Sequence, residues 1–481
     1  MPDYFGESSQ ILGNCPSPGL EQPGDYRHIH WSIRLKKREW GIMLRAMSES
    51  THTIQTPVSG KARIRSIDTL RGVALLGILV INILAFAQPF GSMFDPRVDG
   101  ATEGANFALF AGAEIFVEGG MRAIFSMLFG AGLLIFVNKP GADAGEVRGL
   151  YYRRTGFLVL FGLFNAYALI WVGDILYIYG MTGLLLFLFR NLSANKLLFW
   201  AIGVLLFTTL IHVGLHYSLR QLGEIVAEAQ ALGPGAELTE QQRESVQAWD
   251  AMLADQGLTE AGQAEEVETR HSGYLDNFVF SAGLTIYMQT IGLLVFGLWD
   301  TLGMMLLGMA LMKWRVFDAS RSMRFYLLLM LLGFGVGLPL NAWETMTFVE
   351  SGYQLHWQSI NRPTYDLGRL SLALGYIGLV MVVCRSGVLT RLQAALANVG
   401  QMALTNYLMQ TIICNLVFLG IGFGQFAAWD RSGMYLFVLG VWLFQIVFSH
   451  IWLRHYRFGP FEWLWRSLTY RRRQPMLEAG S

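Results

Sequence analysis

The chain has 481 residues, of which 53% are hydrophobic and 15% are charged, and its mean hydropathy is +0.39. This composition excludes an ordinary soluble domain and indicates a membrane protein with several spans, for which the lipid bilayer is the main partner. The net charge of +1 points to no particular partner, and we expect no nucleic acid to bind.

The first 60 residues are polar and lack apolar periodicity, so we expect residues 1–60 to form a disordered cytoplasmic extension. The apolar pattern begins near Lys61. The sequence therefore leaves open which methionine is the native start, Met1, Met43 or Met47.

The first predicted span covers residues 67–90, which exceeds the length of about 20 residues needed to cross a hydrocarbon core. Asp68 and Arg71 lie three residues apart near its start, so they share a helix face and can pair. The same face continues to Asn82. Ionised groups at membrane depth are costly unless they pair or face water, so these residues and Arg65 form a candidate site. The alternative is that Asp68 favours the first helical turn while the arginines anchor the cytoplasmic interface.

Nine further apolar runs are long enough to span a membrane. They cover residues 121–137, 155–171, 174–189, 197–217, 281–312, 323–340, 366–384, 396–420 and 433–453. The run 281–312 is longer than one span needs and Asp300 interrupts it, which predicts an interfacial approach followed by a span. Small residues in the segment FSMLFGAG favour close helix packing.

Lysine and arginine dominate alternate short loops, which places both termini in the cytoplasm. The predicted fold class is therefore all-α, a polytopic transmembrane bundle of about ten spans. The predicted parts are an N-terminal membrane bundle (61–219), an acidic periplasmic insertion (220–275), a C-terminal membrane domain (276–475) and a tail (476–481). Within the C-terminal domain, tryptophans and arginines around Trp463 predict a helix that lies at the headgroup level.

Clustered guanidinium groups at the cytoplasmic side suit a phosphate-bearing donor, because each can hold two phosphate oxygens. Arg153 and Arg154, at the start of the third span, extend the group formed by Arg65 and Arg71. The alternative is anchoring at the cytoplasmic interface, which we favour for Arg154.

Two other polar groups lie in or beside the apolar runs. Asp174 stands at the turn between the third and fourth spans, where it is either a site residue or a helix N-cap. Asn398, Asn406 and Gln410 share one face of the ninth span, and interhelical hydrogen bonds would account for them.

Histidine is the usual acid or base near neutral pH. The predicted topology places four on the outer side, namely His212, His216, His271 and His356. For any single one of them we favour a structural or solvated role over a catalytic one, and His356 is the candidate if one acts as a catalytic base. His212 and His216 share a helix face, but two histidines do not make a zinc site, and three scattered cysteines add none. No motif for nucleotide binding or protease chemistry occurs.

Five stretches of the chain carry a family resemblance. They read RSIDTLRGVALLGILVINI, FSMLFGAG, WVGDILYIYG, VGQMALTNYLMQTIICNL and WLRHYRFGPFEWLWRSLTY. Together they resemble the YeiB family of bacterial inner-membrane proteins, whose C-terminal half is catalogued as a domain of unknown function. The resemblance covers nearly all of residues 63–475.

That family looks distantly similar to integral-membrane acyltransferases, which share an Asp-x-x-Arg entrance to the first span, here Asp68 and Arg71. The similarity implies a cytoplasmic acyl donor, typically acyl-CoA, and an acceptor on the outer face. Two positions depart from the pattern. Asn82 stands where acyltransferase-3 proteins have His, and Asn165 where family members often have His.

The leading hypothesis is therefore transfer or handling of an acyl group at the membrane. In it, Arg71 and Arg153 hold the donor phosphates, Asp68 orients Arg71, Asn82 lines the acyl path and His356 acts as base. The alternatives are a small-solute transporter or permease and a non-catalytic envelope protein. The absence of a clear internal repeat argues against a standard transporter.

Overall fold

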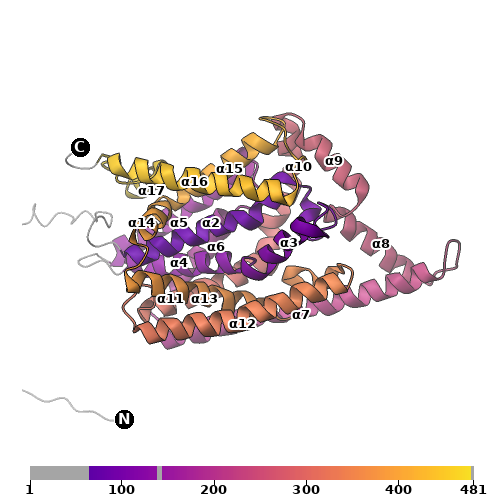
Figure 1. The fold of residues 1–481 in the computed structure, drawn as a ribbon, viewed down its shortest axis with the longest axis horizontal. Coiled ribbons are helices and arrows are strands. Elements are labelled where there is room, and N and C mark those ends of the chain that lie inside the picture. Colours follow the sequence, from indigo (N-terminus) through magenta and orange to yellow (C-terminus); the bar gives the residue numbers. More distant parts are fainter. Residues whose placement is uncertain (1–63, 138–143, 478–481) are drawn as a thin grey trace, which may run out of the picture. The chain divides into compact units, whose positions relative to one another are not determined.

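The computed structural model describes residues 64–137 and 144–477 (Figure 1). Within these ranges the chain folds into helices and connecting turns, and the sole β-type contact is an isolated bridge between Tyr456 and Leu477. The predicted all-α class is confirmed. The predicted disordered extension, residues 1–60, lies outside the described residues.

The α-helices follow one another with short connections. They are α2 (Arg65–Ala87), α3 (Gly104–Phe116), α4 (Gly120–Val137), α5 (Ala144–Leu163), α6 (Ile175–Leu186), α7 (Ala194–Ala231), α8 (Glu240–Asp255), α9 (Glu260–Arg270), α10 (Tyr274–Tyr287), α11 (Leu298–Lys313), α12 (Met323–Glu350), α13 (Tyr365–Ser386), α14 (Thr390–Gln401), α15 (Ala403–Phe418), α16 (Arg431–His455) and α17 (Pro460–Tyr470). Wider π-helical turns form η3 (Phe164–Ala168) and η5 (Met288–Gly297). Tight 3-10 turns form η2 (Phe90–Met93), η4 (Phe187–Phe189), η6 (Leu355–Trp357) and η7 (Ser359–Asn361).

Seven helical segments of the described chain are long and apolar enough to cross a membrane, judged by length and composition. They are Arg65–Ala87, Gly104–Val137, Ala194–Ala231, Tyr274–Lys313, Met323–Glu350, Tyr365–Ser386 and Arg431–His455. The chain is thus a polytopic membrane protein. The predicted ten crossings, the cytoplasmic termini and the division into parts at 219 and 276 stay predictions.

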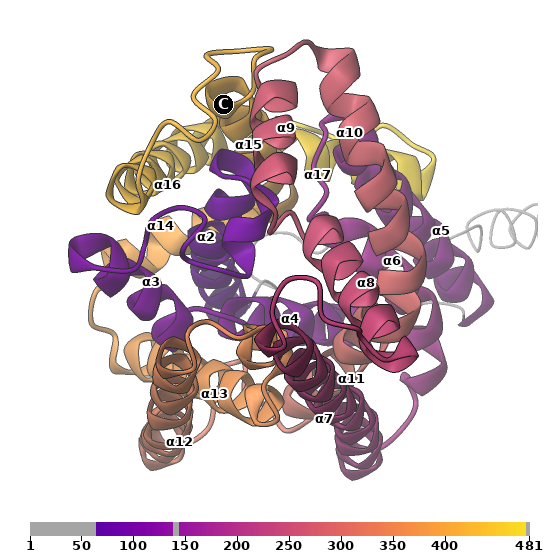
Figure 2. The same cartoon turned by 90° about the vertical axis from the view of Figure 1, so that its right-hand side faces the viewer.

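Helices α2, α4 and α11 form the centre of the bundle, and Figure 2 shows the long helices α7, α12 and α16 towards its periphery. Glycine permits the crossing of α4 and α11. A Cβ atom at Gly130 would lie 2.0 Å from the Met305 carbonyl oxygen, and one at Gly308 would lie 1.9 Å from that of Met127. Gly130 belongs to FSMLFGAG, so the predicted close packing of that segment is confirmed.

Several helix boundaries differ from the sequence prediction. The fifth predicted span ended at residue 217, but its helix continues to Ala231. The seventh ended at residue 340, but its helix continues through Pro339 to Glu350. Both helices are thus longer than the apolar runs from which they were predicted. The ninth is two helices, α14 and α15, which meet at Met402.

The predicted approach segment and sixth span form one continuous helical stretch, Tyr274–Lys313. The interruption expected at Asp300 is wrong. The carboxylate lies in the first turn of α11 and is tolerated there because it pairs with an arginine of another helix.

A buried carboxylate attaches the C-terminal helix α17 to the bundle. Glu462 accepts hydrogen bonds from the backbone N–H groups of Leu404 at 2.7 Å and Thr405 at 3.1 Å, in the first turn of α15. Negative charge at a helix N-terminus stabilises that helix. The expected helix around Trp463 is confirmed, whereas its depth in the membrane stays a prediction.

The membrane topology can be tested on α8 and α9, which lie at the opposite end of the bundle from the start of α2 and from α17 (Figure 1). We expect Gln247→Cys, an exposed position on α8, to react with a membrane-impermeant maleimide in intact spheroplasts. Arg385→Cys, an exposed position at the C-terminal end of α13, should react only after lysis. Both are made after the three native cysteines are replaced. The reverse pattern would refute the orientation.

Candidate functional site

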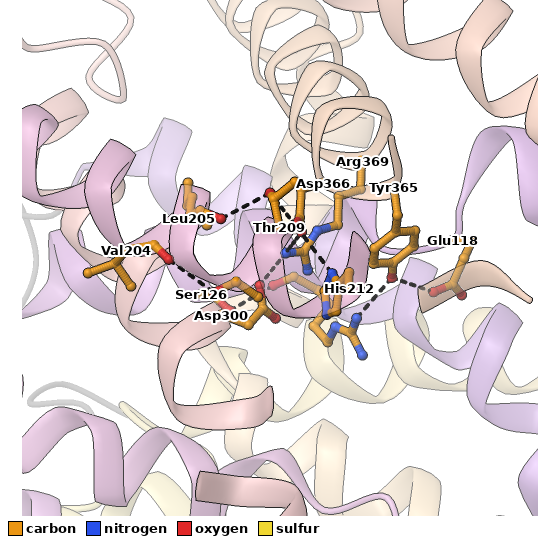
Figure 3. Close-up of polar contacts among 12 residues, drawn as sticks. Glu118, Ser126, Val204, Leu205, Thr209, His212, Asp300, Tyr365, Asp366 and Arg369 are labelled. Carbon is orange, nitrogen blue, oxygen red and sulfur yellow. Dashed lines mark hydrogen bonds and ion pairs between the residues drawn. The ribbon is translucent and has the colours of Figure 1, made fainter. Parts of the chain in front are cut away.

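Arg369 is the centre of a buried ionic network (Figure 3). Its Nη2 forms ion pairs with Oδ1 of Asp300 on α11 and Oδ1 of Asp366, one turn earlier on α13. The Arg369 side chain is 2% exposed. Removing one ion from water costs several kcal/mol, so a guanidinium group at this depth depends on both carboxylates.

Local structure brings these groups together. Asp366 and Arg369 are three residues apart on α13 and therefore share a face. Gly119, with φ of +68°, separates α3 from α4, and a Cβ atom there would lie 2.8 Å from Cβ of Arg369 and 2.9 Å from the Tyr365 hydroxyl. Only glycine allows this close approach. The π-helical turns of η5 precede Asp300, and such turns are frequent at functional sites.

Asp366 also faces a histidine of α7. Nδ1 of His212 lies 3.3 Å from Oδ2 of Asp366, and the Thr209 hydroxyl donates to the same oxygen at 2.6 Å. The His212 ring stacks on Phe296 of η5, with ring centroids 6.2 Å apart. The carboxylate and the aromatic ring together orient the imidazole, which leaves Nε2 as the nitrogen available for proton transfer.

A second branch of the network runs through Tyr365. Its hydroxyl accepts a hydrogen bond from Nη2 of Arg122 at 3.0 Å and donates to Oε1 of Glu118 at 2.9 Å. Arg122 is an exposed residue, although α4 packs against α2, α11 and α13. This branch of the network therefore extends to the protein surface at Arg122.

A third branch lies beside the turn between α12 and α13. Nη2 of Arg362 pairs with Oε2 of Glu114 at 2.9 Å. The Thr364 hydroxyl donates to Oε1 of Glu344 on α12, a residue that is 1% exposed. Across the described ranges no group of three or more His, Cys, Asp or Glu residues is placed to hold a metal ion.

The predicted cytoplasmic group lies at the start of α2 and on α5. Nη1 of Arg71 donates to Oδ1 of Asp68 at 3.0 Å, so the predicted pairing is confirmed. Arg65 donates to the carbonyl of Thr390 at 3.3 Å. Both arginines of α5 contact α17: Arg153 donates to the Thr469 carbonyl at 2.9 Å, and the Arg154 guanidinium lies 4.0 Å from the Trp465 ring centroid.

Asp174 is the N-cap of α6, as the structural alternative predicted. Its Oδ2 accepts from the backbone N–H of Tyr177 and its Oδ1 from the side-chain amide of Asn165, each at 2.8 Å. The second contact comes from η3. A binding role for Asp174 stays a prediction.

The amide ladder makes interhelical hydrogen bonds, as expected. Its partners on α16 form the pairs Asn398 with His450 (3.3 Å), Asn406 with Ser449 (3.0 Å) and Gln410 with Gln445 (3.0 Å). Asn406 also donates to the Val399 carbonyl of α14 at 3.1 Å. The break at Met402 does not disturb this arrangement. These contacts account for the ladder structurally.

Asn82 is half-buried on α2 and takes no part in the network as described. His356 lies in η6, where its ring centroid is 5.0 Å from that of His216. Burial and the nearby His216 lower the pKa of His356 to about 4. A base with so low a pKa binds protons weakly at neutral pH. His212 differs from His356 in that it faces a carboxylate, that of Asp366.

The sequence prediction missed most of this network. A signal for Asp366 and Arg369 was present, because they repeat the Asp-x-x-Arg spacing of Asp68 and Arg71 at the start of another span. Glu344 was not included in a predicted span, because the apolar run 323–340 ends four residues before it. No local pattern links these positions to His212.

Comparison with known proteins identifies the family. A family model described as "Protein of unknown function (DUF418)" matches residues 311–472. "Uncharacterized protein YeiB" of Escherichia coli (strain K12) is 32% identical over 430 residues, which cover 86% of this chain and 98% of the relative. The chain belongs to the YeiB family.

A second YeiB-family relative, "Uncharacterized protein YxaH" of Bacillus subtilis (strain 168), is 29% identical over 435 residues, 87% of this chain and 97% of the relative. No solved structure matches the chain. The resemblance drawn from the five sequence stretches is thus confirmed as family membership, and the function of the YeiB-family fold has to be inferred from its site.

Proposed function

We propose that this protein is an acyltransferase-like enzyme of the bacterial inner membrane, which takes an acyl group from a cytoplasmic donor, acyl-CoA, to an acceptor on the outer face. The observation that carries the proposal is the pairing of His212 with Asp366 inside the bundle. A histidine oriented by a carboxylate is the usual general base for activating a hydroxyl or amine nucleophile.

The proposed reaction forms a bond between the acceptor O or N atom and the acyl carbonyl carbon, and it breaks the C–S bond of the thioester. Nε2 of His212 takes the proton of the attacking group and returns it to the departing thiolate. Asp366 stabilises the imidazolium that forms in between. The guanidinium group of Arg122 can stabilise negative charge that develops on the carbonyl oxygen.

The donor end of this proposal is the arginine group at the start of α2. Asp68 aims the guanidinium group of Arg71, and the Arg71 side chain is 26% exposed, so phosphate oxygens can reach it. Arg153 extends the group from α5. A planar guanidinium group binds phosphate in two-point contacts that an ammonium group cannot reproduce.

The donor site is tested by binding. We expect Arg71→Lys to weaken acyl-CoA binding at least tenfold, which corresponds to about 1.4 kcal/mol. Isothermal titration of purified protein against several acyl-CoAs and free CoA measures this, and Arg385→Lys, a change at an exposed arginine of α13, serves as control. If the wild type binds none of these compounds, the acyltransferase proposal loses its donor.

A small-solute transporter is the second candidate. Its support is the chain of ionisable groups on α4, α7, α11 and α13, of a kind that serves as proton relays in transporters. Proton-coupled uptake into proteoliposomes without consumption of acyl-CoA would favour this alternative over acyl transfer.

A further inference from the structure

The ionic network contains more carboxylates than guanidinium groups. The carboxylates are Glu114, Glu118, Asp300, Glu344 and Asp366, and the guanidinium groups belong to Arg122, Arg362 and Arg369. With every carboxylate and guanidinium group ionised and His212 neutral, the negative charges would exceed the positive charges by two. An unbalanced charge in a medium of low dielectric constant is strongly unfavourable, so protons or cations have to reduce the excess.

Glu344 is the member that lacks a cationic partner. It is 1% exposed, and among the described residues its carboxylate forms no ion pair. The charged groups that act on it are Arg362, Glu114 and Asp366. Burial is the main reason that a negative charge on Glu344 is disfavoured; the carboxylates of Glu114 and Asp366 oppose it further, whereas Arg362 favours it.

The one nearby guanidinium group is already engaged. Nη2 of Arg362 pairs with Glu114 at 2.9 Å, and its Nε donates to the Trp357 carbonyl at 2.8 Å. Arg369 is engaged as well, because it pairs with the carboxylates of Asp300 and Asp366. In the described part of the chain, the hydrogen bond to Glu344 comes from the Thr364 hydroxyl, a neutral donor.

We propose that Glu344 is a proton-binding site inside the helix bundle, which holds one exchangeable proton in the resting protein. A proton, rather than a metal ion, is the ligand that fits, because the described residues place no cluster of three acidic, His or Cys side chains for a cation. The site does not depend on acyl transfer. It would equally serve an enzyme that releases protons or a transporter driven by them.

Infrared spectroscopy of the purified protein tests the proposal, because a protonated carboxylic acid has a carbonyl stretch distinct from that of a carboxylate. We expect the wild type to show this band at neutral pH and to lose it on raising the pH. Glu344→Gln should lose the part of the band that Glu344 contributes and fold normally, since the amide mimics the neutral acid in shape. Glu350→Gln, exposed on the same helix, should keep the band.

A second variant serves if Glu344→Gln does not fold. Thr364→Val removes the hydroxyl that donates to Glu344, so it should shift the band without removing it. Retention of the full band in Glu344→Gln would overturn the proposal. A wild-type protein without the band, or a band that sodium chloride abolishes at constant pH, would overturn it in favour of an ionised or cation-binding Glu344.

Discussion

Replacing Arg369 by Met is expected to lower the free energy of unfolding by about 3–5 kcal/mol, because removal of one partner from a buried ion pair leaves an uncompensated charge. Here two carboxylates, those of Asp300 and Asp366, would lose their shared cation. Methionine keeps most of the side-chain volume, so the effect reports on charge. Denaturant or thermal unfolding in detergent, followed by loss of helical signal, measures it.

The matched control is Arg385→Met at the exposed end of the same helix, which should change stability by at most about 1 kcal/mol. Adding Asp300→Asn to Arg369→Met should recover part of the loss, since it removes one of the two unpaired charges. Equal free energies of unfolding for the Arg369 and Arg385 variants would show that the carboxylates of the network do not depend on Arg369 for their stability.

His212→Gln is expected to reduce acyl transfer by about 10²–10⁴-fold, the range typical for removal of a general base. Donor binding should stay unchanged, because the contacts described for Arg65, Arg71 and Arg153 do not include His212. Release of free CoA thiol from acyl-CoA by reconstituted vesicles measures the rate, and its pH profile should lose the limb that reports on histidine.

His216→Gln is the matched control, because His216 lies one turn away on α7 and its Nδ1 contacts the His356 carbonyl at 2.7 Å instead of a carboxylate. We expect it to keep most of the activity. A loss as large as that of His212→Gln would remove the special role of the His212–Asp366 pair. Loss of activity in Asp366→Asn with an unchanged fold would support it.

The sequence by itself determined the elements that rest on short-range physics. Apolar run length predicted the membrane-crossing helices, because burying backbone in lipid requires helices of fixed length. The three-residue spacing predicted the pair of Asp68 and Arg71. The position of Asp174 before an apolar run made an N-cap one of its two interpretations, and the structure shows that N-cap. The amides of α15 were correctly interpreted as interhelical, since polar groups in an apolar helix need partners.

Only the tertiary structure decided which ionised groups meet. Asp300 and Arg369 are 69 residues apart in the chain, and His212 and Asp366 come from helices whose apolar patterns are indistinguishable from those of their neighbours. Periodicity tells which face of a helix is polar but not which other helix that face contacts. That choice is made by packing, here by Gly119 and by the π-helical turns of η5, which bring four helices together around one guanidinium group.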